Sequence, residues 1–395
     1  MSTSASRAKA AAVVGIGATE FSKNSGRSEQ RLAVEAVLAA LADAALTPED
    51  VDGTATVAID ATYEQALQRY LGIPELTFFG RAMGGGGGGP ATIALAAAAI
   101  TSGAANVVVC YRALNERSAV RFGRPPATIT SGAPTTQTLD MAWTAPFGIS
   151  TPAAGMALNA RRYLYTYNRT TDDFARFAVA QRGYAATNPN AFFSGRPITI
   201  EDYYASRMVA DPLRLLDCCQ ESDGAVAIVV TSQERAAHLR HQPVLVAATA
   251  MGLSQAHLGQ THMFRDPAGL PLETKLVCDQ LWKKSGLTPG DMDVAILYDH
   301  FGPAVLMQLE AAGFCRPGEA GDLIADGGIE IGGQIPVNTH GGQMGEAYIH
   351  GFNGITEAVR QLRGTAVNQV AGATRALVTA ASHVPTSGLI LEVQR

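Results

Sequence analysis

The chain has 395 residues, of which 47% are hydrophobic and 16% charged, with 30 Lys and Arg against 35 Asp and Glu. This composition excludes a disordered chain, and the net charge of -5 excludes a polybasic protein built to bind nucleic acid. A chain of this length usually folds as two packed halves. Its apolar runs, such as 93–100, are shorter than the roughly 20 residues that a membrane-spanning helix needs.

The termini and the cysteines indicate where the protein works. Residues 1–9 lack the charged start and apolar centre of a signal peptide, so we expect a cytoplasmic protein without a membrane span. The chain has no C-x-x-C pair and no matching histidine spacing, so we expect neither a disulfide framework nor a metal site. Its cysteines are Cys110, Cys218, Cys219, Cys278 and Cys315.

Hydrophobic periodicity predicts strands that alternate with helices, which is typical of an α/β protein. In chain order we expect a strand at 11–18, a helix at 29–46, a strand at 51–59, a helix at 90–102, strands at 106–111, 224–230 and 244–251, a helix at 272–285, a strand at 294–298, a helix at 349–363 and strands at 376–382 and 389–393. The pattern of the first half begins again near residue 244.

Two internal echoes support this duplication. Residues 45–52 and 286–293 are similar in sequence, and the two prolines Pro48 and Pro289 are 241 positions apart. A glycine run at 84–89 before the first buried helix is matched by residues 340–345 before the last one. We therefore predict an N-terminal half at 1–240 and a C-terminal half at 241–395.

The N-terminal half contains an insertion, at about 115–200, that has no counterpart in the other half. We predict that it forms a cap or loop region, because such insertions often shape a substrate pocket. Its aromatic side chains are candidates either for the pocket wall or for ordinary core. They are Trp143, Phe147, Tyr163, Tyr165 and Tyr167.

Each glycine run leads into a helix, where free backbone N–H groups and the positive end of the helix dipole point at one place. Two such ends, related by the duplication, would form a site that stabilises an oxyanion or binds an acyl-CoA. The candidates are Gly86 and Gly87 in the first half, and Gly341 and Gly342 in the second. Alternatively, the glycines only allow helices to pack closely.

Several motifs resemble the thiolase superfamily over nearly the whole chain. They are the Asp-Gly-Ala sequence at 223–225, the Asn-Thr-His-Gly-Gly sequence at 338–342, and the region 98–109. Within this superfamily the chain resembles the bacterial lipid-transfer-protein branch. The resemblance implies an α/β thiolase fold, in which two duplicated βαβαβαββ halves form a five-layer αβαβα arrangement.

The chain departs from thiolases at each catalytic position. The nucleophilic cysteine of thiolases falls on Gly86, the histidine of their Gly-His-Pro motif falls on Tyr348, and their late acid/base cysteine falls near Ala381. Their Asn-Glu-Ala-Phe motif is replaced by Tyr-Asp-His-Phe at 298–301. We therefore expect no thiolytic chemistry. We interpret Cys110 and the pair at 218–219 as core thiols rather than displaced nucleophiles.

Two tyrosines are the catalytic candidates, because each occupies a position that is catalytic in thiolases. Tyr298 lies in the sequence Tyr-Asp-His-Phe at 298–301, and Tyr348 lies in the sequence Gly-Glu-Ala-Tyr-Ile-His-Gly at 345–351. Both sequences resemble those of the steroid-degrading aldolases of the same branch. The resemblance implies a retro-aldol cleavage, with one phenol as base and the other as acid. Because a free phenol has a pKa near 10, something must favour its ionised form.

Polar neighbours in the same motifs are the candidates for that support. Imidazolium or N–H groups of His300, His340 and His350 would stabilise a phenolate, or these histidines hold loops by hydrogen bonds. Asp299 would titrate, or would orient a histidine or backbone groups. The division of proton transfer between the two tyrosines stays open.

The resemblance also implies a substrate and partners. The substrate is a steroid-CoA thioester with a tertiary hydroxyl on the D ring, cleaved to a ketosteroid of the androstenedione type and propionyl-CoA. CoA is part of this substrate, and no separate cofactor is expected. The partners are a second copy of the chain and a small protein with an OB-fold and a zinc ribbon. Two alternatives are a non-catalytic acyl-CoA or lipid-binding scaffold for that partner, and thioester hydrolysis through a water near Asp299 or His300.

Overall fold

The computed structural model describes residues 10–119, 121–123, 144–254, 271–382 and 384–394. In these ranges a mixed sheet has the strand order β3-β2-β4-β7-β1-β8-β11-β10-β9, and β5 and β6 form a separate pair. The strands are β1 (Ala11–Ala18), β2 (Gly53–Val57), β3 (Phe78–Ala82), β4 (Val107–Asn115), β5 (Met208–Ala210), β6 (Leu213–Arg214), β7 (Asp223–Ser232), β8 (Val244–Gly252), β9 (Val294–Ile296), β10 (Arg375–Thr379) and β11 (Thr386–Glu392).

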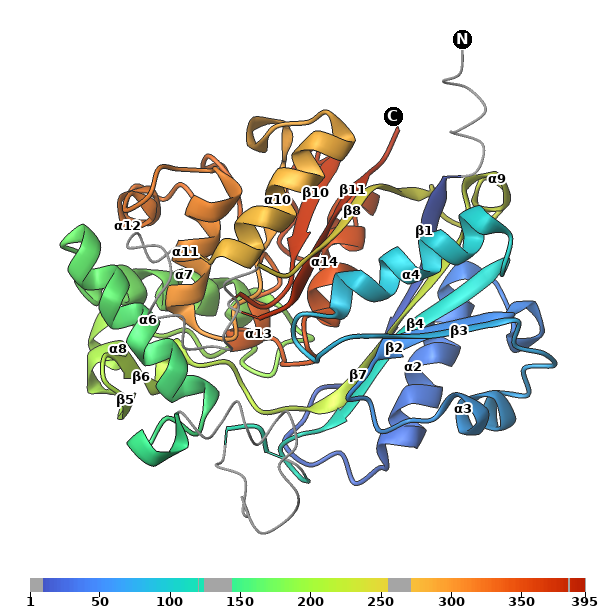
Figure 1. The fold of residues 1–395 in the computed structure, drawn as a ribbon, viewed down its shortest axis with the longest axis horizontal. Coiled ribbons are helices and arrows are strands. Elements are labelled where there is room, and N and C mark those ends of the chain that lie inside the picture. The colour runs from blue at the N-terminus through green and yellow to red at the C-terminus, as the bar shows by residue number, and fades with distance from the viewer. Residues whose placement is uncertain (1–9, 120, 124–143, 255–270, 383, 395) are drawn as a thin grey trace.

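Helices cover both faces of the large sheet (Figure 1). They are α2 (Glu29–Ala44), α3 (Glu64–Leu71), α4 (Gly89–Ser102), α6 (Pro152–Tyr167), α7 (Asp172–Thr187), α8 (Ile200–Ala205), α9 (Gln233–Ala236), α10 (Leu272–Ser285), α11 (Gly302–Ala312), α12 (Ala320–Ala325), α13 (Gly342–Gly345) and α14 (Phe352–Arg363). None of the helices in the described parts of the chain combines the length and the apolar character that crossing a membrane requires.

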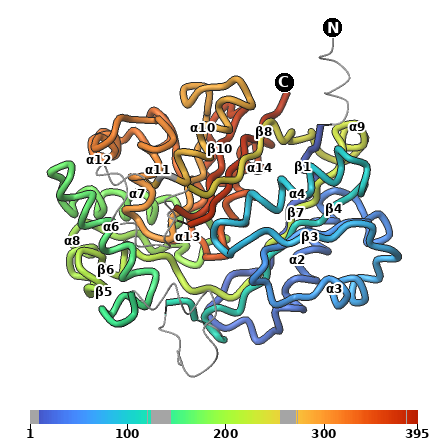
Figure 2. The backbone as a smooth tube through the Cα atoms, viewed as in Figure 1, coloured from blue at the N-terminus to red at the C-terminus, as the bar shows by residue number. Residues whose placement is uncertain are grey.

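The two halves repeat one order of elements. In the first half the order is β1, α2, β2, α4, β4 and β7, and in the second it is β8, α10, β9, α14, β10 and β11. Figure 2 shows the first half running from blue through cyan and green to yellow-green, and most of the second in orange and red. The predicted echo forms the same turn twice, because the backbone N–H of Thr47 donates to Asp50 at 2.9 Å and that of Thr288 donates to Asp291 at 2.8 Å.

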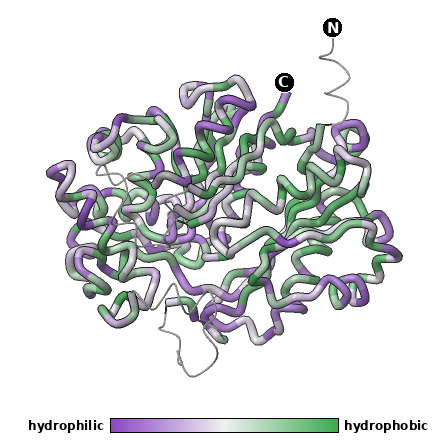
Figure 3. Tube along the Cα trace, in the orientation of Figure 1, coloured by the Kyte–Doolittle hydropathy of each residue, from purple (hydrophilic) through white to green (hydrophobic). Residues whose placement is uncertain are grey.

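The apolar side chains form three cores, which alternate with the two halves of the sheet. Successive residues of a strand point to opposite faces, so Val14 packs with α2 in an outer core while Val13 packs with α4 and α14 in the middle core. In the second half, Val378 joins the middle core and Leu377 the other outer core with α10 and α11. Figure 3 shows these apolar strands and the hydrophilic outer turns. The predicted five-layer thiolase fold is confirmed.

The inserted region of the first half packs on the second half. Its helix α7 lies against α11, α12 and α13, which belong to the C-terminal part of the chain (Figure 1). The two halves also meet where β1 pairs with β8. The insertion and the ends of α4 and α13 thereby enclose a space near the middle of the molecule.

The predicted elements differ from the observed ones mainly at their ends. Strand β4 continues to Asn115, four residues beyond its predicted end, because it pairs along its whole length with β7. The last helix begins at Phe352 rather than three residues earlier, because Gly351 has a left-handed backbone with φ of 79°. Strand β3 and helix α11 were absent from the prediction.

Candidate active site

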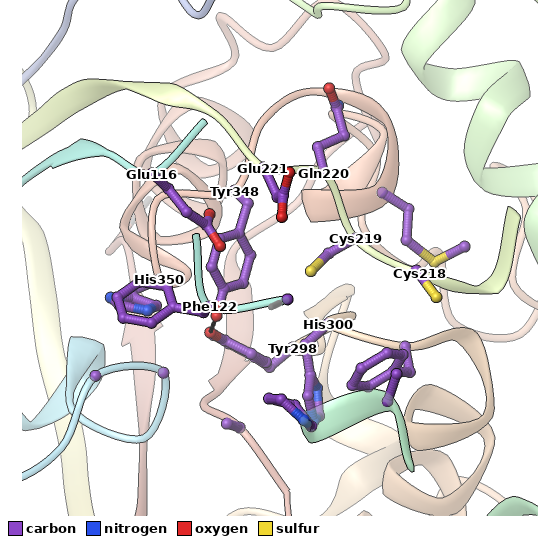
Figure 4. Close-up of a pocket in the computed structure, with 18 of the residues that line it drawn as sticks. Glu116, Phe122, Cys218, Cys219, Gln220, Glu221, Tyr298, His300, Tyr348 and His350 are labelled. Carbon is purple, nitrogen blue, oxygen red and sulfur yellow. Dashed lines mark hydrogen bonds between the residues drawn. The ribbon is translucent and has the colours of Figure 1, made fainter. Parts of the chain in front are cut away.

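A cavity of about 670 Å³ lies between the two halves and the insertion. The glycine loop before α4, the end of β4, the segment before β7, and the loops after β9 and α13 contribute to its wall. Figure 4 shows its central side chains, among which Tyr298, Tyr348, His300 and His350 converge from the second half. With Gly86 and Gly87, which also line it, the structure thus brings six of the residues predicted for the site into one cavity.

The two candidate tyrosines contact each other in this cavity. The hydroxyl of Tyr298 donates to that of Tyr348 over 3.2 Å, and the ring planes meet at 74°. Burial raises the pKa of both phenols well above the ordinary value near 10. Both phenols are therefore neutral near pH 7, and as such they are proton donors or members of a relay.

Tyr298 occupies the space into which a side chain at Gly86, the position predicted for the thiolase nucleophile, would extend. A Cβ atom on Gly86 would lie 2.8 Å from Cζ of Tyr298, closer still to its hydroxyl oxygen, and 3.2 Å from Cβ of Ala381. The backbone N–H of Ala381 donates to the carbonyl of Gly86 at 3.0 Å. The positions assigned to the two missing cysteines and to one of the tyrosines thus meet at one point, and a side chain at Gly86 would require the Tyr298 ring to move.

The neighbouring glycine serves close packing. A Cβ atom on Gly87 would overlap the carbonyl oxygen of Pro385, so this position requires glycine. The hydroxyl of Ser387 donates to the carbonyl of Gly87 at 2.6 Å and accepts from the N–H of Ala91 at 3.1 Å. Both Gly86 and Gly87 line the cavity, at the N-terminus of α4.

His350 is held in one tautomer by a buried ion pair. Arg112 donates from Nε to Nδ1 of His350 at 3.0 Å and pairs with Asp60 through Nη1 at 2.8 Å. Burial, and then the Arg112 charge, lower the pKa of His350 well below 6.5, so the ring is neutral. Since Nδ1 accepts, the proton is on Nε2. A Cβ atom on Gly85 would lie 3.1 Å from this Nε2, so the N–H is at the glycine loop.

The other two histidines occupy different surroundings. His300 lines the cavity, 5.2 Å from Tyr298 between ring centroids, and burial lowers its pKa to about 4. His340 does not line the cavity: it is buried with Nε2 3.9 Å from Glu346, and burial lowers its pKa to about 3. The three histidines are neutral near pH 7, which leaves a ring N–H rather than an imidazolium as the group that would stabilise a phenolate.

Three further candidates, Asp299, Gly341 and Gly342, contribute to the packing around α13 and do not line the cavity. Asp299 accepts from the N–H groups of Gln343 at 2.8 Å and Met344 at 3.1 Å, so it caps α13. Burial raises its pKa to about 6. Gly341 and Gly342 lie outside the cavity lining, with φ of 99° and 66°, and pack against Ala185 of α7 and Asp299. The N–H of Gly341 donates to the carbonyl of Asn338 at 2.8 Å, and the N–H groups that follow the two glycines donate to Asp299, so neither set of donors points into the cavity wall.

Some of the predicted core residues lie in the core, and others line the cavity. Cys110 is fully buried in the middle core, as predicted, whereas Cys218 and Cys219 line the cavity. Burial raises the pKa of Cys218 to about 12 and that of Cys219 well above 9, so neither is a thiolate. Tyr163 is core.

The insertion lines the cavity with other residues than those predicted. Phe147 and Tyr165 are 80% and 83% exposed, Tyr167 packs on the core, and Trp143 lies outside the described residues. The described residues of the insertion that do line it are Phe122, Gly123, Pro152, Ala153, Ala178, Arg182, Phe193 and Ile198, with Glu116, Arg117 and Arg121 at its start.

The sequence predicted none of the charged groups that line the cavity, among them Lys23 and Glu116. Lys23 donates to Gln220 at 3.0 Å and to the carbonyl of Glu221 at 2.7 Å, and burial lowers its pKa to about 8. Glu116 follows β4 directly, and burial, followed by the Glu221 charge, raises its pKa to about 8. Neither belongs to a recognisable motif, so only its position after a central strand was a signal.

Within the described residues no cluster of three or more His, Cys, Asp or Glu side chains could hold a metal ion.

Family comparison agrees with the fold: the model for the thiolase N-terminal domain matches residues 11–234, and that for the thiolase C-terminal domain-like family matches residues 256–391. The chain therefore belongs to the thiolase superfamily.

Two curated relatives are similar over nearly their whole length. The 17-hydroxy-3-oxo-4-pregnene-20-carboxyl-CoA lyase of Mycobacterium tuberculosis is 58% identical over 382 residues, which are 96% of this chain and 98% of that protein. The steroid side-chain-cleaving aldolase of Thermomonospora curvata is 55% identical over 390 residues, 98% of each chain. A solved structure of the Ltp2-ChsH2(DUF35) aldolase matches with a TM-score of 0.93 and 54% identity over 99% of each chain.

Proposed function

We propose that this protein is a carbon–carbon lyase that cleaves a steroid acyl-CoA by a retro-aldol reaction. The substrate carries a tertiary hydroxyl on the D ring, β to the thioester carbonyl, and the products are a ketosteroid and propionyl-CoA. Similarity to two named steroid lyases over nearly the whole chain supports the activity. The observation that carries the proposal is the Tyr298–Tyr348 contact at the vacated nucleophile position.

The cavity's chemistry favours an aldol over a Claisen reaction. Thiolysis needs a thiolate that forms a covalent adduct. At Gly86 no nucleophile is present, and the two cavity thiols stay protonated. A retro-aldol step needs no covalent adduct with the protein. It needs removal of the hydroxyl proton, stabilisation of the thioester enolate, and protonation of its α carbon.

Named groups are suited to two of these tasks. The N-terminus of α4, with the loop that contains Gly86, offers a positive electrostatic end for the enolate oxygen, and the Nε2–H of His350 offers a hydrogen bond beside it. The neutral Tyr298–Tyr348 pair is suited to deliver a proton to the α carbon. Hydrophobic wall residues, among them Ile198, Leu216 and Phe301, suit a steroid ring system.

The cavity also suits an anionic CoA moiety. Among the described residues, five cationic side chains line it: Lys23, Arg117, Arg121, Arg182 and Arg207. Such a concentration of positive charge at a cavity attracts a substrate with several phosphates. CoA enters as part of the substrate, and the proposal requires no separate cofactor.

We also propose two partners and a location. Edge strand β3 exposes Phe79 (66%), which supports pairing with a second copy of the chain. The solved relative named Ltp2-ChsH2(DUF35) aldolase supports a second partner, with an OB-fold and a zinc ribbon, that binds in trans. All five cysteines are free, which supports a reducing, cytoplasmic location.

The test is direct turnover. The protein is purified with and without its partner and is given a steroid-CoA with a tertiary D-ring hydroxyl, and both products are followed by mass spectrometry. Equal amounts of ketosteroid and propionyl-CoA support the proposal. Tight binding of the thioester without cleavage, with the partner present, contradicts it and favours a scaffold.

A further inference from the structure

The carboxyl group of Glu116 is a buried acid in the cavity that no role yet explains. The side chain is 3% exposed and lines the cavity with Tyr298 and Tyr348. Figure 4 shows its carboxyl directed toward Tyr348, whose hydroxyl meets that of Tyr298. Backbone N–H groups of Ser222 and Phe122 hydrogen-bond to the carboxyl, but its Oε2 has no partner among the described residues. A buried carboxyl oxygen without a hydrogen bond destabilises the fold, so the position of Oε2 indicates a hydrogen bond to a bound ligand.

Charged and titratable groups face Glu116 from each neighbouring segment. Glu221 raises its pKa and Lys23 lowers it. Arg121 and Arg117 lie on the same segment as Glu116, and both pair with Glu221. The groups that face it from elsewhere are the thiol of Cys219, the phenols of Tyr298 and Tyr348, and the ring of His350. Burial is the largest effect, and the resulting pKa of Glu116 is about 8.

The retro-aldol reaction lacks a base among the predicted residues. Both phenols are neutral, and their pKa is too high for ready ionisation. The His300 ring is neutral, but with a pKa of about 4 it is a weak proton acceptor. Lys23 has a pKa of about 8, but its ammonium already donates to Gln220 and Glu221. An efficient base has a pKa near the working pH.

We propose that Glu116, as a carboxylate, is the base that accepts the hydroxyl proton of the bound substrate. This rests on the proposed function. The proton moves to Glu116, the O–H electron pair becomes the new C=O bond, and the electron pair of the broken Cα–Cβ bond forms the thioester enolate. A phenol of the Tyr298–Tyr348 pair protonates the α carbon, and the proton on Glu116 returns to that phenol. No oxidant, reductant or water is consumed.

The experiment measures kcat/KM between pH 6 and pH 9.5 with the partner-bound protein and the steroid-CoA substrate. For the unaltered protein we expect a rise with a midpoint near the pKa of Glu116, about 8. In Glu116→Gln we expect a loss of at least about 100-fold at pH 8 and no rise with pH. Glu116→Asp, which keeps a carboxyl, should recover part of the rate together with the rise.

A second variant keeps the test independent of any damage at Glu116 itself. Glu221→Gln removes the like charge that raises the pKa of Glu116, so the midpoint should move to lower pH. The proposal is overturned if Glu116→Gln lowers kcat/KM by the same factor at every pH and leaves the midpoint of the pH profile unchanged. It is also overturned if the rise of kcat/KM with pH is kept in Glu116→Gln and vanishes in Lys23→Gln. If the unaltered protein does not cleave the substrate, the proposed function fails and this assignment with it. Cleavage with a fully active Glu116→Gln removes this assignment alone.

Discussion

Gly86 and Tyr298 compete for one space in the structure. A Cβ atom on Gly86 would lie 2.8 Å from Cζ of Tyr298 and 3.2 Å from Cβ of Ala381. The tyrosine ring therefore stands where a nucleophilic side chain would extend. Loss of that nucleophile and gain of the phenol are one structural change rather than two.

The first prediction tests this competition. Gly86→Ala should destabilise the fold by about 1–3 kcal/mol, because the added methyl group overpacks the site. In a Tyr298→Ala background the same change should cost much less, because the ring is gone. Chemical denaturation of the unaltered protein, the two single variants and the double variant gives the coupling free energy between the two positions. An equal cost in both backgrounds would show that Gly86 is constrained by something else. Gly86→Cys should not give thiolase activity.

The second prediction concerns the phenols. Tyr298→Phe and Tyr348→Phe should each lower kcat/KM by about 10²–10⁴-fold, because each removes a proton-transfer group. The double variant should lose little more than either single one, because the two hydroxyls act as one hydrogen-bonded unit. Tyr184→Phe is the matched control, since its hydroxyl bonds the carbonyl of Ile329 outside the cavity. Full activity in a Phe variant removes that phenol from the mechanism.

The third prediction concerns the ion pair behind His350. Asp60→Asn should destabilise the protein by about 3–5 kcal/mol, because it leaves the Arg112 guanidinium buried without its counter-charge. Asp279→Asn is the comparison, because its partner Lys275 and Asp279 itself are about half exposed. That variant should change the free energy of unfolding by less than about 1 kcal/mol. Urea unfolding measures both, and similar values would contradict the role of burial.

The fourth prediction concerns acid sensitivity. His340 is neutral in the fold, with a pKa of about 3, and titrates near 6.5 when unfolded. Because the folded pKa is depressed, the unfolded state binds more protons as pH falls below about 6.5, so the stability from this group is lost on acidification. The loss of folding free energy spans the range from about pH 6.5 down to about pH 3.

The His340→Leu variant isolates that effect from other buried groups. Below pH 6.5 its free energy of unfolding should fall less steeply than that of the unaltered protein, by up to about 1.4 kcal/mol per pH unit. Urea unfolding at pH 7, 6, 5 and 4.5 gives the two slopes. Parallel slopes would mean that His340 is not buried neutral.

Local signals explain which elements were predictable. Helix α10 has both predicted ends, because Pro271 precedes it and Gly286 ends it with a left-handed φ of 72°. Helix α11 is buried on all sides, so its sequence has no apolar face and no helical period. Strand β3 lies at the sheet edge and lacks a clear alternation. Both elements owe their structure to packing that the local sequence does not report.

By itself, the sequence determined the duplicated α/β architecture and the two motifs that carry Tyr298 and Tyr348, because periodicity and motifs are local properties. Only the tertiary structure decided that their hydroxyls meet at 3.2 Å, that His340, Gly341 and Gly342 lie outside the cavity lining, and that Glu116 lines it. These facts depend on contacts between segments far apart in the chain. The pKa values do too, because desolvation and neighbouring charge exist only once those segments have packed.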